Sequence, residues 1–233
     1  MELNTALIFF MRYPSPGKVK TRLAAGIGDH AACELYSCFI RDILQTTDST
    51  GLDVHIFAWP AHELDHVKNW LKKEYLLFPQ NGSDLGEKMK NAFEQVFELG
   101  YSKALLTGSD IPDLPAQVIL EAEQCLDTHD CVLGPSRDGG YYLVGFNKKR
   151  FCPAIFSGPQ WGTHQVLEQT RAILKNNRIA TALATPWRDV DEVDDLKALH
   201  ARLTDNITRA EATRACLENL QVQRPNFFTR DQS

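Results

Sequence analysis

Short apolar runs alternate with amphipathic stretches along almost the whole chain, and this alternation limits the fold more than any other feature. Residues 5–11 and 104–107 are apolar and rich in strand-forming side chains, and each run leads directly into a polar loop. A strand that is apolar on both faces has to be covered by helices on both sides. The sequence therefore predicts an α/β fold: a three-layer α/β/α sandwich of Rossmann-like type, with a mostly parallel central sheet.

The same pattern continues through the rest of the chain. Residues 52–59 and 76–79 are expected to form further strands, and two strand-like runs within 131–146 flank a glycine-rich turn. Asp29 begins an amphipathic stretch that reaches residue 46 with apolar side chains at helical spacing. The alternation persists to about Leu203 without a low-complexity linker. We therefore expect one domain over residues 1–233, with a flexible tail at 224–233.

Composition excludes several classes of function. The 233 residues carry 25 Lys and Arg against 30 Asp and Glu, which gives a net charge of −5 and no global basic field for nucleic acid. No apolar stretch approaches the roughly 20 residues that span a bilayer. The six cysteines lack the CxxC spacing typical of zinc sites. We therefore expect a cytoplasmic protein without nucleic-acid or membrane partners, and its oligomeric state stays open.

A carboxylate stands directly after the strand at 104–107. Gly108 and Ser109 form a small-residue turn, Asp110 follows, and Pro112 prevents the strand from continuing. In open α/β sheets, ligands bind at the carboxyl ends of the strands. Asp110 is therefore a candidate ligand for a hard divalent cation that carries phosphates, and a simple turn cap is the alternative interpretation.

The strand at 5–11 leads into a loop that is rich in positive charge. Its candidate nucleotide- or phosphate-binding residues are Arg12, Gly17, Lys18, Lys20 and Arg22. Glycine lets the backbone approach a ligand closely, and Lys and Arg side chains neutralise phosphate charge. The loop does not match the P-loop pattern GxxxxGK[ST], because no glycine stands five residues before Gly17 and valine follows Lys18. A solvated basic loop is the alternative.

Two later segments carry further candidate contacts. Residues 80–88 form a polar loop in which Gln80 and Gly86 offer an amide side chain and backbone groups to a nucleobase edge, although a plain strand-to-helix connection has the same composition. Asp138 stands beside a glycine pair, which a hairpin turn also explains. The candidate acceptor- or sugar-binding residues are Gly139, Gly140, Tyr141, Trp161 and Thr163. Half-buried packing is the alternative interpretation of Trp161.

Four aspartates lie within residues 189–195. Like charges this close repel one another unless a cation, a helix N-terminus or solvent absorbs the charge. Asp194 and Asp195 suit a helix amino end, whereas Asp189 and Asp191 face the same side of an extended segment and Asp191 is the candidate second metal carboxylate. The HExxH pattern at 62–66 resembles that of zinc proteases, but its apolar partners lie on the opposite helix face, so we interpret it as a surface helix.

Several motifs occur in an order that resembles one family. They are PGKVKTRL at 16–23, Gln80 with DLG at 84–86, GSDIPD at 108–113, LGP at 133–135 with DGGYYL at 138–143, WGT at 161–163, and DVD at 189–191. Over roughly residues 5–203 the chain resembles the DUF2064 family of glycosyltransferase-A-like proteins. Members are often labelled arsenosugar-biosynthesis glycosyltransferases or radical-SAM/selenodomain-associated transferases.

The resemblance implies the fold of nucleotide-diphospho-sugar transferases and a role for each motif. The first loop would grip phosphates, the loop at 80–86 would contact the base, and Asp110 with Asp191 would bind Mg²⁺ or Mn²⁺. Asp138 would be the catalytic residue that orients or deprotonates an acceptor hydroxyl. The metal and the cationic side chains would stabilise charge on a departing diphosphate. The chain departs from the usual Asp-x-Asp metal motif, because Asp113 follows Asp110 by three residues.

These features together predict a metal-dependent enzyme that transfers a sugar from a nucleotide-diphospho-sugar to a small acceptor. Nucleotidyl transfer from a nucleoside triphosphate to a phosphorylated small molecule, with release of pyrophosphate, is the alternative chemistry, because KTRL at 20–23 and DVD at 189–191 also resemble segments of nucleotidyltransferases. A nucleotide-binding module without turnover is the alternative from a different class. The base, the sugar and the acceptor depend on pocket geometry that motif spacing does not reveal.

Overall fold

The computed structural model describes residues 3–71, 73–204, 210–224 and 227–228. The chain forms two compact units, each assembled from three segments. Met1–Tyr13, Thr47–Gly108 and Ala116–Arg188 form the first, which we call the sheet unit. Pro14–Thr46, Ser109–Pro115 and Asp189–Ser233 form the second, which we call the helical unit. Because the units interleave along the chain, the expectation of a single domain stays a prediction.

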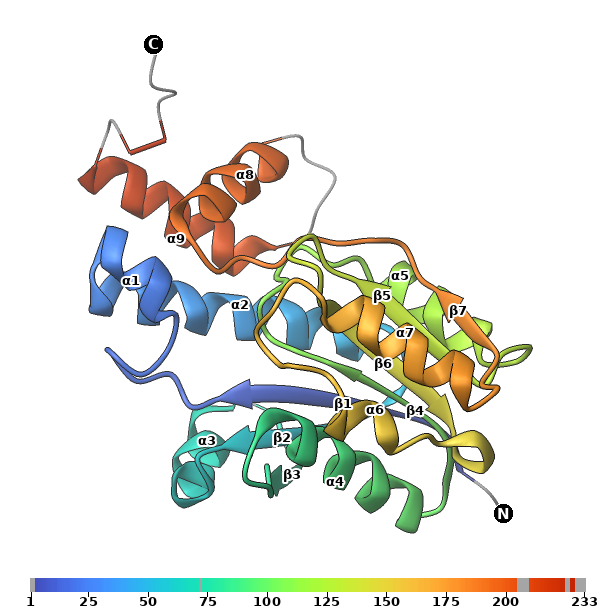
Figure 1. The fold of residues 1–233 in the computed structure, drawn as a ribbon. Helices are drawn as coiled ribbons and strands as arrows, with labels where there is room; N and C mark the ends of the chain where they lie inside the picture. Colours follow the sequence, from blue (N-terminus) through green and yellow to red (C-terminus); the bar gives the residue numbers. More distant parts are fainter. Residues whose placement is uncertain (1–2, 72, 205–209, 225–226, 229–233) are drawn as a thin grey trace. The chain divides into compact units, whose positions relative to one another are not determined.

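All the strands among the described residues lie in the sheet unit, in one seven-stranded sheet of order β3-β2-β1-β4-β6-β5-β7 (Figure 1). They are β1 (Leu3–Arg12), β2 (Asp53–Trp59), β3 (Leu76–Pro79), β4 (Tyr101–Thr107), β5 (Cys131–Pro135), β6 (Tyr141–Asn147) and β7 (Thr181–Leu183). Only β6 runs antiparallel to its neighbours β4 and β5, and the other pairs are parallel. The mostly parallel α/β fold is confirmed.

The described residues form nine α-helices and two short 3-10 helices. They are α1 (Thr21–Ile27), α2 (Asp29–Ser49), η1 (Ala61–Glu63), α3 (Leu64–Trp70), α4 (Leu85–Glu98), α5 (Ala116–Cys125), η2 (Lys148–Arg150), α6 (Ala154–Ser157), α7 (Val166–Asn176), α8 (Val193–Leu203) and α9 (Glu211–Gln223). None of these helices combines the length and the apolar character that a membrane crossing requires.

Helices cover both faces of the sheet within the sheet unit. On one face, Phe93 of α4 and Phe156 of α6 pack into a core with Ile8 of β1 and Phe146 of β6. On the other face lies α5, whose Glu123 carboxylate accepts a hydrogen bond of 2.8 Å from Thr5 Oγ1 of β1. Leu7, Ile8 and Phe9 of β1 are all fully buried, which explains why this strand is apolar on both faces.

The helical unit contains α1, α8, α9 and most of α2. Gly26 of α1 lies so close to α8 that an added Cβ would come within 2.3 Å of a Val193 methyl group. The Asp42 carboxylate of α2 accepts backbone N–H hydrogen bonds from Ala212 (3.0 Å) and Thr213 (2.7 Å) at the start of α9. These contacts tie the amino-terminal helices to those near the carboxyl terminus.

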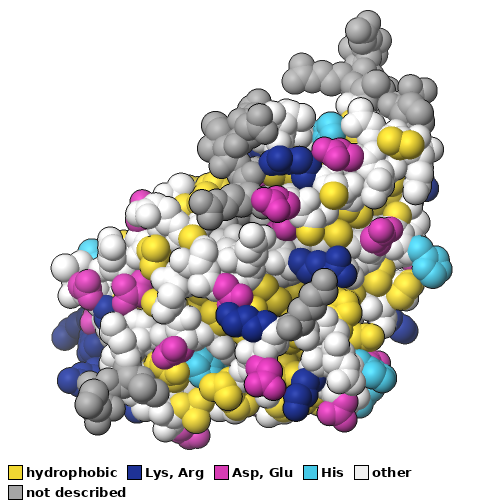
Figure 2. Space-filling view, turned by 180° about the vertical axis from the view of Figure 1, so that it is seen from behind, with side chains coloured by type: hydrophobic (Ala, Val, Ile, Leu, Met, Phe, Trp, Pro, Cys, Tyr) yellow, Lys and Arg dark blue, Asp and Glu magenta, His cyan; other side chains and the backbone are white. Residues whose placement is uncertain are grey.

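Some sequence expectations need adjustment. The helix at 29–46 extends to Ser49, and β7 was not anticipated because only three residues form it and none of them is fully buried. Most of the predicted tail at 224–233 lies outside the described residues. All six cysteines are free thiols. On the face drawn in Figure 2, Lys and Arg side chains are interspersed with Asp and Glu, without an extended basic patch.

Candidate functional site

Three residues that are far apart in the sequence meet in the helical unit. The Lys20 ammonium lies 2.7 Å from Asp110 Oδ1 and 2.9 Å from Asp191 Oδ1. The Lys20 side chain is only 5% exposed, whereas the side chains of Asp110 and Asp191 are 45% and 27% exposed. The structure therefore brings together the two predicted metal carboxylates and one predicted phosphate-binding lysine, with the lysine between the carboxylates.

One backbone hydrogen bond and one side-chain hydrogen bond position the segments that carry Asp110 and Asp191. The Val190 N–H donates a hydrogen bond of 2.9 Å to the Asp110 carbonyl oxygen, which fixes the residue before Asp191 against Asp110. The Ser109 hydroxyl lies 2.8 Å from the Tyr36 hydroxyl of α2. Asp110 follows β4 in the chain and Lys20 follows β1. β1 and β4 are neighbours in the strand order.

Lys20 has an unusual backbone conformation. It is the N-cap of α1 with φ 47° and ψ 45°, in the left-handed region that residues other than glycine rarely adopt. Such a conformation costs about 1–2 kcal/mol for a residue with a Cβ, and it persists only where surrounding contacts stabilise it. The two ion pairs of the Lys20 side chain are contacts of this kind.

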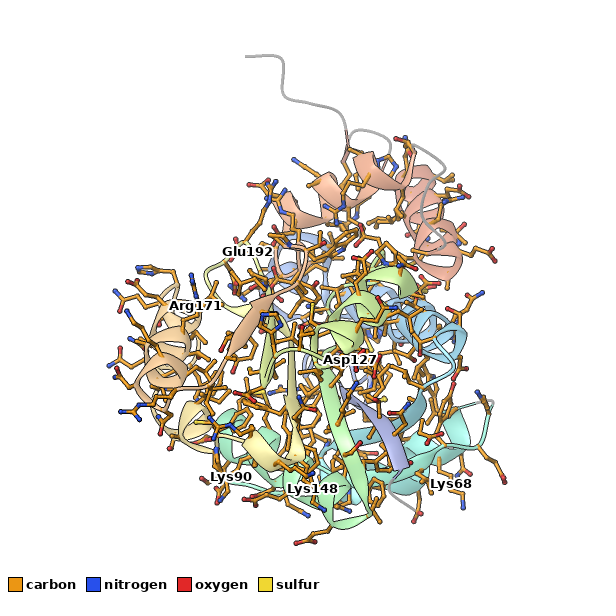
Figure 3. All side chains as sticks on the ribbon, turned by 90° about the vertical axis from the view of Figure 1, so that its right-hand side faces the viewer. Lys68, Lys90, Asp127, Lys148, Arg171 and Glu192 are labelled. Atoms are coloured by element: carbon orange, nitrogen blue, oxygen red, sulfur yellow. The ribbon has the colours of Figure 1, made fainter. Side chains whose placement is uncertain are left out.

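Arg22 and Glu192 extend the charged cluster. Arg22 Nη2 lies 2.6 Å from Asp191 Oδ2, and Arg22 Nη1 lies 3.3 Å from Glu192 Oε1. Glu192, labelled in Figure 3, is the N-cap of α8. Asp195 Oδ2 accepts hydrogen bonds from the backbone N–H groups of Asp191 (3.2 Å) and Glu192 (3.1 Å), which confirms the predicted place of Asp195 at a helix amino end.

The charges in this cluster shift one another's ionisation. Burial alone would lower the pKa of the Lys20 ammonium, but Asp110 and Asp191 outweigh burial and raise that pKa above its ordinary value. Burial alone would raise the pKa of the Asp191 carboxyl, but Lys20 and then Arg22 outweigh it and lower that pKa. Lys20 and Asp191 are therefore both charged at neutral pH.

Asp113 has a different partner. Its carboxylate is fully buried, and Arg202 Nε of α8 lies 2.7 Å from its Oδ2. A charge buried this deeply needs a partner of opposite sign, and Arg202 supplies it. Asp110 and Asp113 therefore contact different partners in the structure. Asp191, supplied from the other end of the sequence, stands beside Asp110 instead.

Gln80 follows β3 in the sheet unit and is buried. Its side-chain Nε2 donates to the carbonyl oxygens of Met11 (3.1 Å) and Phe57 (2.9 Å). Both amide N–H groups therefore hold the ends of β1 and β2 together. A contact from this side chain to a base would use the amide oxygen.

Gly86 has a packing role in the first turn of α4. A Cβ at this position would lie 1.9 Å from the Phe156 carbonyl oxygen and 2.6 Å from Trp161 Nε1. Trp161 is half-buried, and its Nε1 donates to the Phe156 carbonyl oxygen at 3.4 Å. Its ring meets the Tyr141 ring edge-on, with 6.1 Å between centroids. Trp161 therefore has the half-buried packing that was the alternative to its predicted role in acceptor or sugar binding.

Asp138 lies in the exposed hairpin turn between β5 and β6. Its Oδ1 accepts hydrogen bonds from the Ser136 hydroxyl and from the Gly140 N–H, the latter at 2.9 Å. Gly139 has φ +89°, and a Cβ there would lie 2.0 Å from the His164 carbonyl oxygen. These contacts give Asp138 and both glycines a structural role in the turn. Thr163 donates to the Gln160 carbonyl oxygen at 2.9 Å.

The remaining predicted residues lie where the chain leaves β1. Arg12 is the last residue of the strand and is exposed, as are Gly17 and Lys18. Gly17 has φ +73°, so its left-handed conformation favours glycine. Apart from Arg12, Gly17 and Lys18, the predicted residues fall into two groups in the structure. Lys20, Arg22, Asp110 and Asp191 form one cluster in the helical unit, and the candidate base- and acceptor-binding residues belong to the sheet unit.

Histidine and cysteine contribute no metal centre to the described part of the chain. No group of three or more His, Cys, Asp or Glu side chains there is placed to hold a metal ion. The two histidines of the HExxH pattern, His62 and His66, are largely exposed, as expected, but they lie on two successive short helices, η1 and α3, and not on one. Any metal at Asp110 and Asp191 would take its other ligands from water or from a bound substrate.

Comparisons with known proteins agree with this architecture. The sequence profile of one family, described as an uncharacterized protein conserved in bacteria (DUF2064), matches residues 43–163. A crystal structure from Desulfovibrio desulfuricans G20, named as that of a candidate nucleotide-diphospho-sugar transferase, is 36% identical in sequence. The alignment covers 96% of this chain and 97% of that one, with a TM-score of 0.89. The chain belongs to the DUF2064 family.

More distant structures share the fold of this DUF2064 protein. A 4-diphosphocytidyl-2C-methyl-D-erythritol synthase from Anaerococcus prevotii is 9% identical, with a TM-score of 0.57 over 86% of this chain and 96% of that one. A cytidylyltransferase from Leptospira borgpetersenii is 13% identical, with a TM-score of 0.54 over 99% and 98% of the two chains. No match was found among curated proteins.

Sequence reasoning missed three side chains of this DUF2064 chain. Glu192 and Arg202 pair with Arg22 and Asp113, partners that stand 170 and 89 residues away, so no local pattern indicates them. Lys88 of α4 lies 3.6 Å above the centre of the Trp59 ring. Burial and the neighbouring Arg12 lower the pKa of the Lys88 ammonium. The only sequence signal that could have identified Lys88 as a candidate residue is its position at the end of the polar loop at 80–88.

Proposed function

We propose that this chain is a nucleotide-utilising transferase that moves a sugar from a nucleotide-diphospho-sugar to a small acceptor. The observation that carries the proposal is the convergence of Asp110, Asp191, Lys20 and Arg22. Two carboxylates and two cations, supplied by the segments after β1 and β4 and before α8, are the groups that a metal-bound diphosphate requires. The 36% identical relative, named for the same class of transferase, supports the choice.

The residues present fit Mg²⁺ or Mn²⁺ in donor chemistry. Asp110 and Asp191 each turn one carboxylate oxygen toward the same ammonium group, so both already face one cation. Hard divalent cations that carry phosphates commonly bind one or two protein carboxylates and complete their coordination with phosphate and water. When bound, the metal would supply electrostatic stabilisation of the leaving diphosphate.

The chain's own residues would carry out the other roles. Lys20 and Arg22 would donate charged hydrogen bonds to phosphate oxygens as negative charge develops on the leaving group. Gln80 would offer its amide oxygen to the base. Asp138 would orient or deprotonate the acceptor hydroxyl with Oδ2, since Oδ1 is the oxygen that accepts the hydrogen bonds of the turn.

The alternative is nucleotidyl transfer, in which the acceptor attacks the α-phosphate of a nucleoside triphosphate and pyrophosphate leaves. The shared fold with nucleotidyl-transferring enzymes keeps this chemistry in consideration. A thermal-shift panel of nucleotide sugars, nucleoside diphosphates and triphosphates, each with Mn²⁺, Mg²⁺ or EDTA, separates the two. A ligand at about 100 times its Kd should add about 2.7 kcal/mol, or several degrees in Tm.

Each outcome of the panel has a defined meaning. A metal-dependent shift with one nucleoside diphosphate and its sugar supports glycosyl transfer, and a shift confined to a triphosphate supports nucleotidyl transfer. Binding without product from any donor and acceptor favours a nucleotide-binding module. No shift with any ligand contradicts the proposal.

Asp110→Asn tests the metal carboxylate directly. Because the Asp110 side chain is nearly half exposed, we expect this variant to stay within about 1 kcal/mol of the parent in stability. Its affinity for the metal–nucleotide complex should fall at least about tenfold, as measured by calorimetric titration with the donor that the panel identifies. Glu218→Gln, an exposed carboxylate of α9, is the matched control. Unchanged affinity in Asp110→Asn would rule out the metal assignment.

A further inference from the structure

The Lys20 ammonium occupies the space between one oxygen of Asp110 and one oxygen of Asp191, the two carboxylates that would hold the metal. It lies within 2.9 Å of an oxygen of each carboxylate and is almost completely shielded from solvent. A divalent cation cannot share this position with an ammonium group, because two like charges a few ångströms apart repel strongly where water does not screen them. Metal binding between these oxygens therefore requires Lys20 to leave them.

A displaced ammonium group needs a new anionic partner. Arg22 and Glu192 already pair with each other at the edge of the cluster. The anion that arrives with the metal is the diphosphate of the substrate, whose oxygens accept charge-assisted hydrogen bonds from lysine. The lysine side chain has a flexible four-carbon stem and can change partner without any movement of the backbone.

We propose that the Lys20 ammonium prevents free divalent cations from binding to Asp110 and Asp191. A diphosphate makes the two carboxylates available to the metal by binding the Lys20 ammonium itself. This inference rests on the proposed function and adds an order to it: metal and diphosphate bind as a unit, and neither carboxylate holds a metal beforehand. By linkage, each then raises the affinity of the other by the same factor.

The test measures two affinities whose changes have opposite signs. The first is that of Mn²⁺ alone, followed by electron paramagnetic resonance of the free ion in a buffer without phosphate. Lys20→Met and Lys20→Gln should each bind one Mn²⁺ at least tenfold more tightly than the parent. Lys197→Met removes the same charge from α8, in the same unit. Since Lys197 is exposed and has no ion pair within the described residues, the Mn²⁺ affinity of this variant should stay within twofold of the parent.

The second affinity is that of inorganic pyrophosphate in EDTA, measured by calorimetry. Lys20→Met should bind pyrophosphate at least fivefold more weakly than the parent, because the ammonium that would transfer to the phosphate is gone. A purely structural role for Lys20 would weaken both affinities together. In the double variant Lys20→Met/Asp110→Asn, the gain in Mn²⁺ affinity should disappear, which assigns the gained site to this carboxylate pair.

The inference is overturned if neither Lys20 variant binds Mn²⁺ more tightly than the parent, or if the gain survives in the double variant. Circular dichroism and Tm establish that each variant folds, and the glutamine variant keeps hydrogen-bonding groups should the methionine variant be unstable. The proposed function is judged separately. If the parent shows a metal-dependent Tm shift with a nucleotide while Lys20→Met gains no Mn²⁺ affinity, the transferase proposal is retained. The proposal that Lys20 blocks metal binding to the two carboxylates is then rejected.

Discussion

At the scale of single residues, side chains in this protein act through partners that the sequence does not place beside them. Lys20 belongs to a basic loop whose other lysine, Lys18, is exposed, yet Lys20 itself is buried between two carboxylates. Asp110 and Asp113 belong to one motif, yet one faces Lys20 and the other forms a buried pair with Arg202. The role of each charge therefore depends on its burial and its partner.

A tyrosine in the sheet unit provides a test of ionisation. Burial, followed by a hydrogen bond of 3.1 Å to Asp53, raises the pKa of the Tyr101 hydroxyl to about 12. Because the folded state holds this proton more tightly than the unfolded chain, Tyr101 contributes stability below about pH 10, and that contribution is lost as pH rises toward 12. Burial also raises the pKa of the Tyr75, Tyr141 and Tyr142 phenols, so spectrophotometric titration at alkaline pH should show several late phenols, and Tyr101→Phe should remove one of them, near pH 12.

Stability measurements provide the companion check. Between about pH 9.5 and 11, around the ordinary tyrosine pKa, the free energy of unfolding of the parent should fall more steeply with pH than that of Tyr101→Phe. Equal slopes for the two proteins would mean that Tyr101 ionises normally.

At the scale of elements, helix ends and close approaches decide how this chain packs. The helix α9 begins at Glu211 without a side-chain cap of its own, because Ala210 occupies the N-cap position. Two backbone N–H groups of its first turn donate hydrogen bonds to the Asp42 carboxylate of α2, about 170 residues earlier in the chain. The helix α4 is capped locally, by the Asp84 side chain, which accepts from the Glu87 N–H at 2.8 Å.

Asp42→Ala should destabilise the protein by about 1–2 kcal/mol, because it leaves two backbone donors of α9 without their acceptor. Asp42→Asn keeps one acceptor oxygen and should lose less. Urea denaturation followed by circular dichroism gives both values. If Asp42→Ala matches the parent, the contact between α2 and α9 contributes nothing to stability.

Gly86→Ala should destabilise the protein by more than about 2 kcal/mol, since its Cβ would overlap the Phe156 carbonyl oxygen, a backbone atom that cannot move freely. Gly108→Ala is the matched control. Apart from its chain neighbours, no atom lies within 4 Å of the position that its new methyl group would occupy, so it should stay within about 0.5 kcal/mol of the parent. Thermal denaturation of both variants tests whether α4 and α6 approach each other this closely.

At the scale of the whole molecule, chain connectivity links the two units. Each unit consists of three separate segments, so the chain crosses from one to the other five times. The segments of one unit meet at a lower entropy cost when the intervening segments of the other unit are also compact, because closing long unfolded loops costs entropy. This arrangement differs from that of two domains joined by one linker.

We therefore expect a single unfolding transition in calorimetry, with equal calorimetric and van't Hoff enthalpies. Asp42→Ala in the helical unit and Gly86→Ala in the sheet unit should each shift that one transition. Two transitions, with each variant affecting only one of them, would contradict both the cooperative behaviour and the prediction of a single domain.

The sequence by itself determined the fold class of this protein and much of its strand and helix pattern. Apolar periodicity, turn residues and caps act over a few residues, so β1, β2, β3 and the hairpin around Asp138 could be predicted from local pattern. The DUF2064 motifs also indicated which loops carry the candidate site. β7 escaped prediction because three partly buried residues leave no periodic signal.

Only the tertiary structure decided which charges meet. Asp191 joins Asp110 and Lys20 across 171 residues of chain, Arg202 takes Asp113 away from them, and Asp42 caps a helix far from it in sequence. Such pairings are set by how strands order themselves and how helices pack, and no residue pattern records them in advance. The physical reason is range: secondary structure arises from neighbours in the chain, whereas ion pairs and hydrogen bonds depend on neighbours in space.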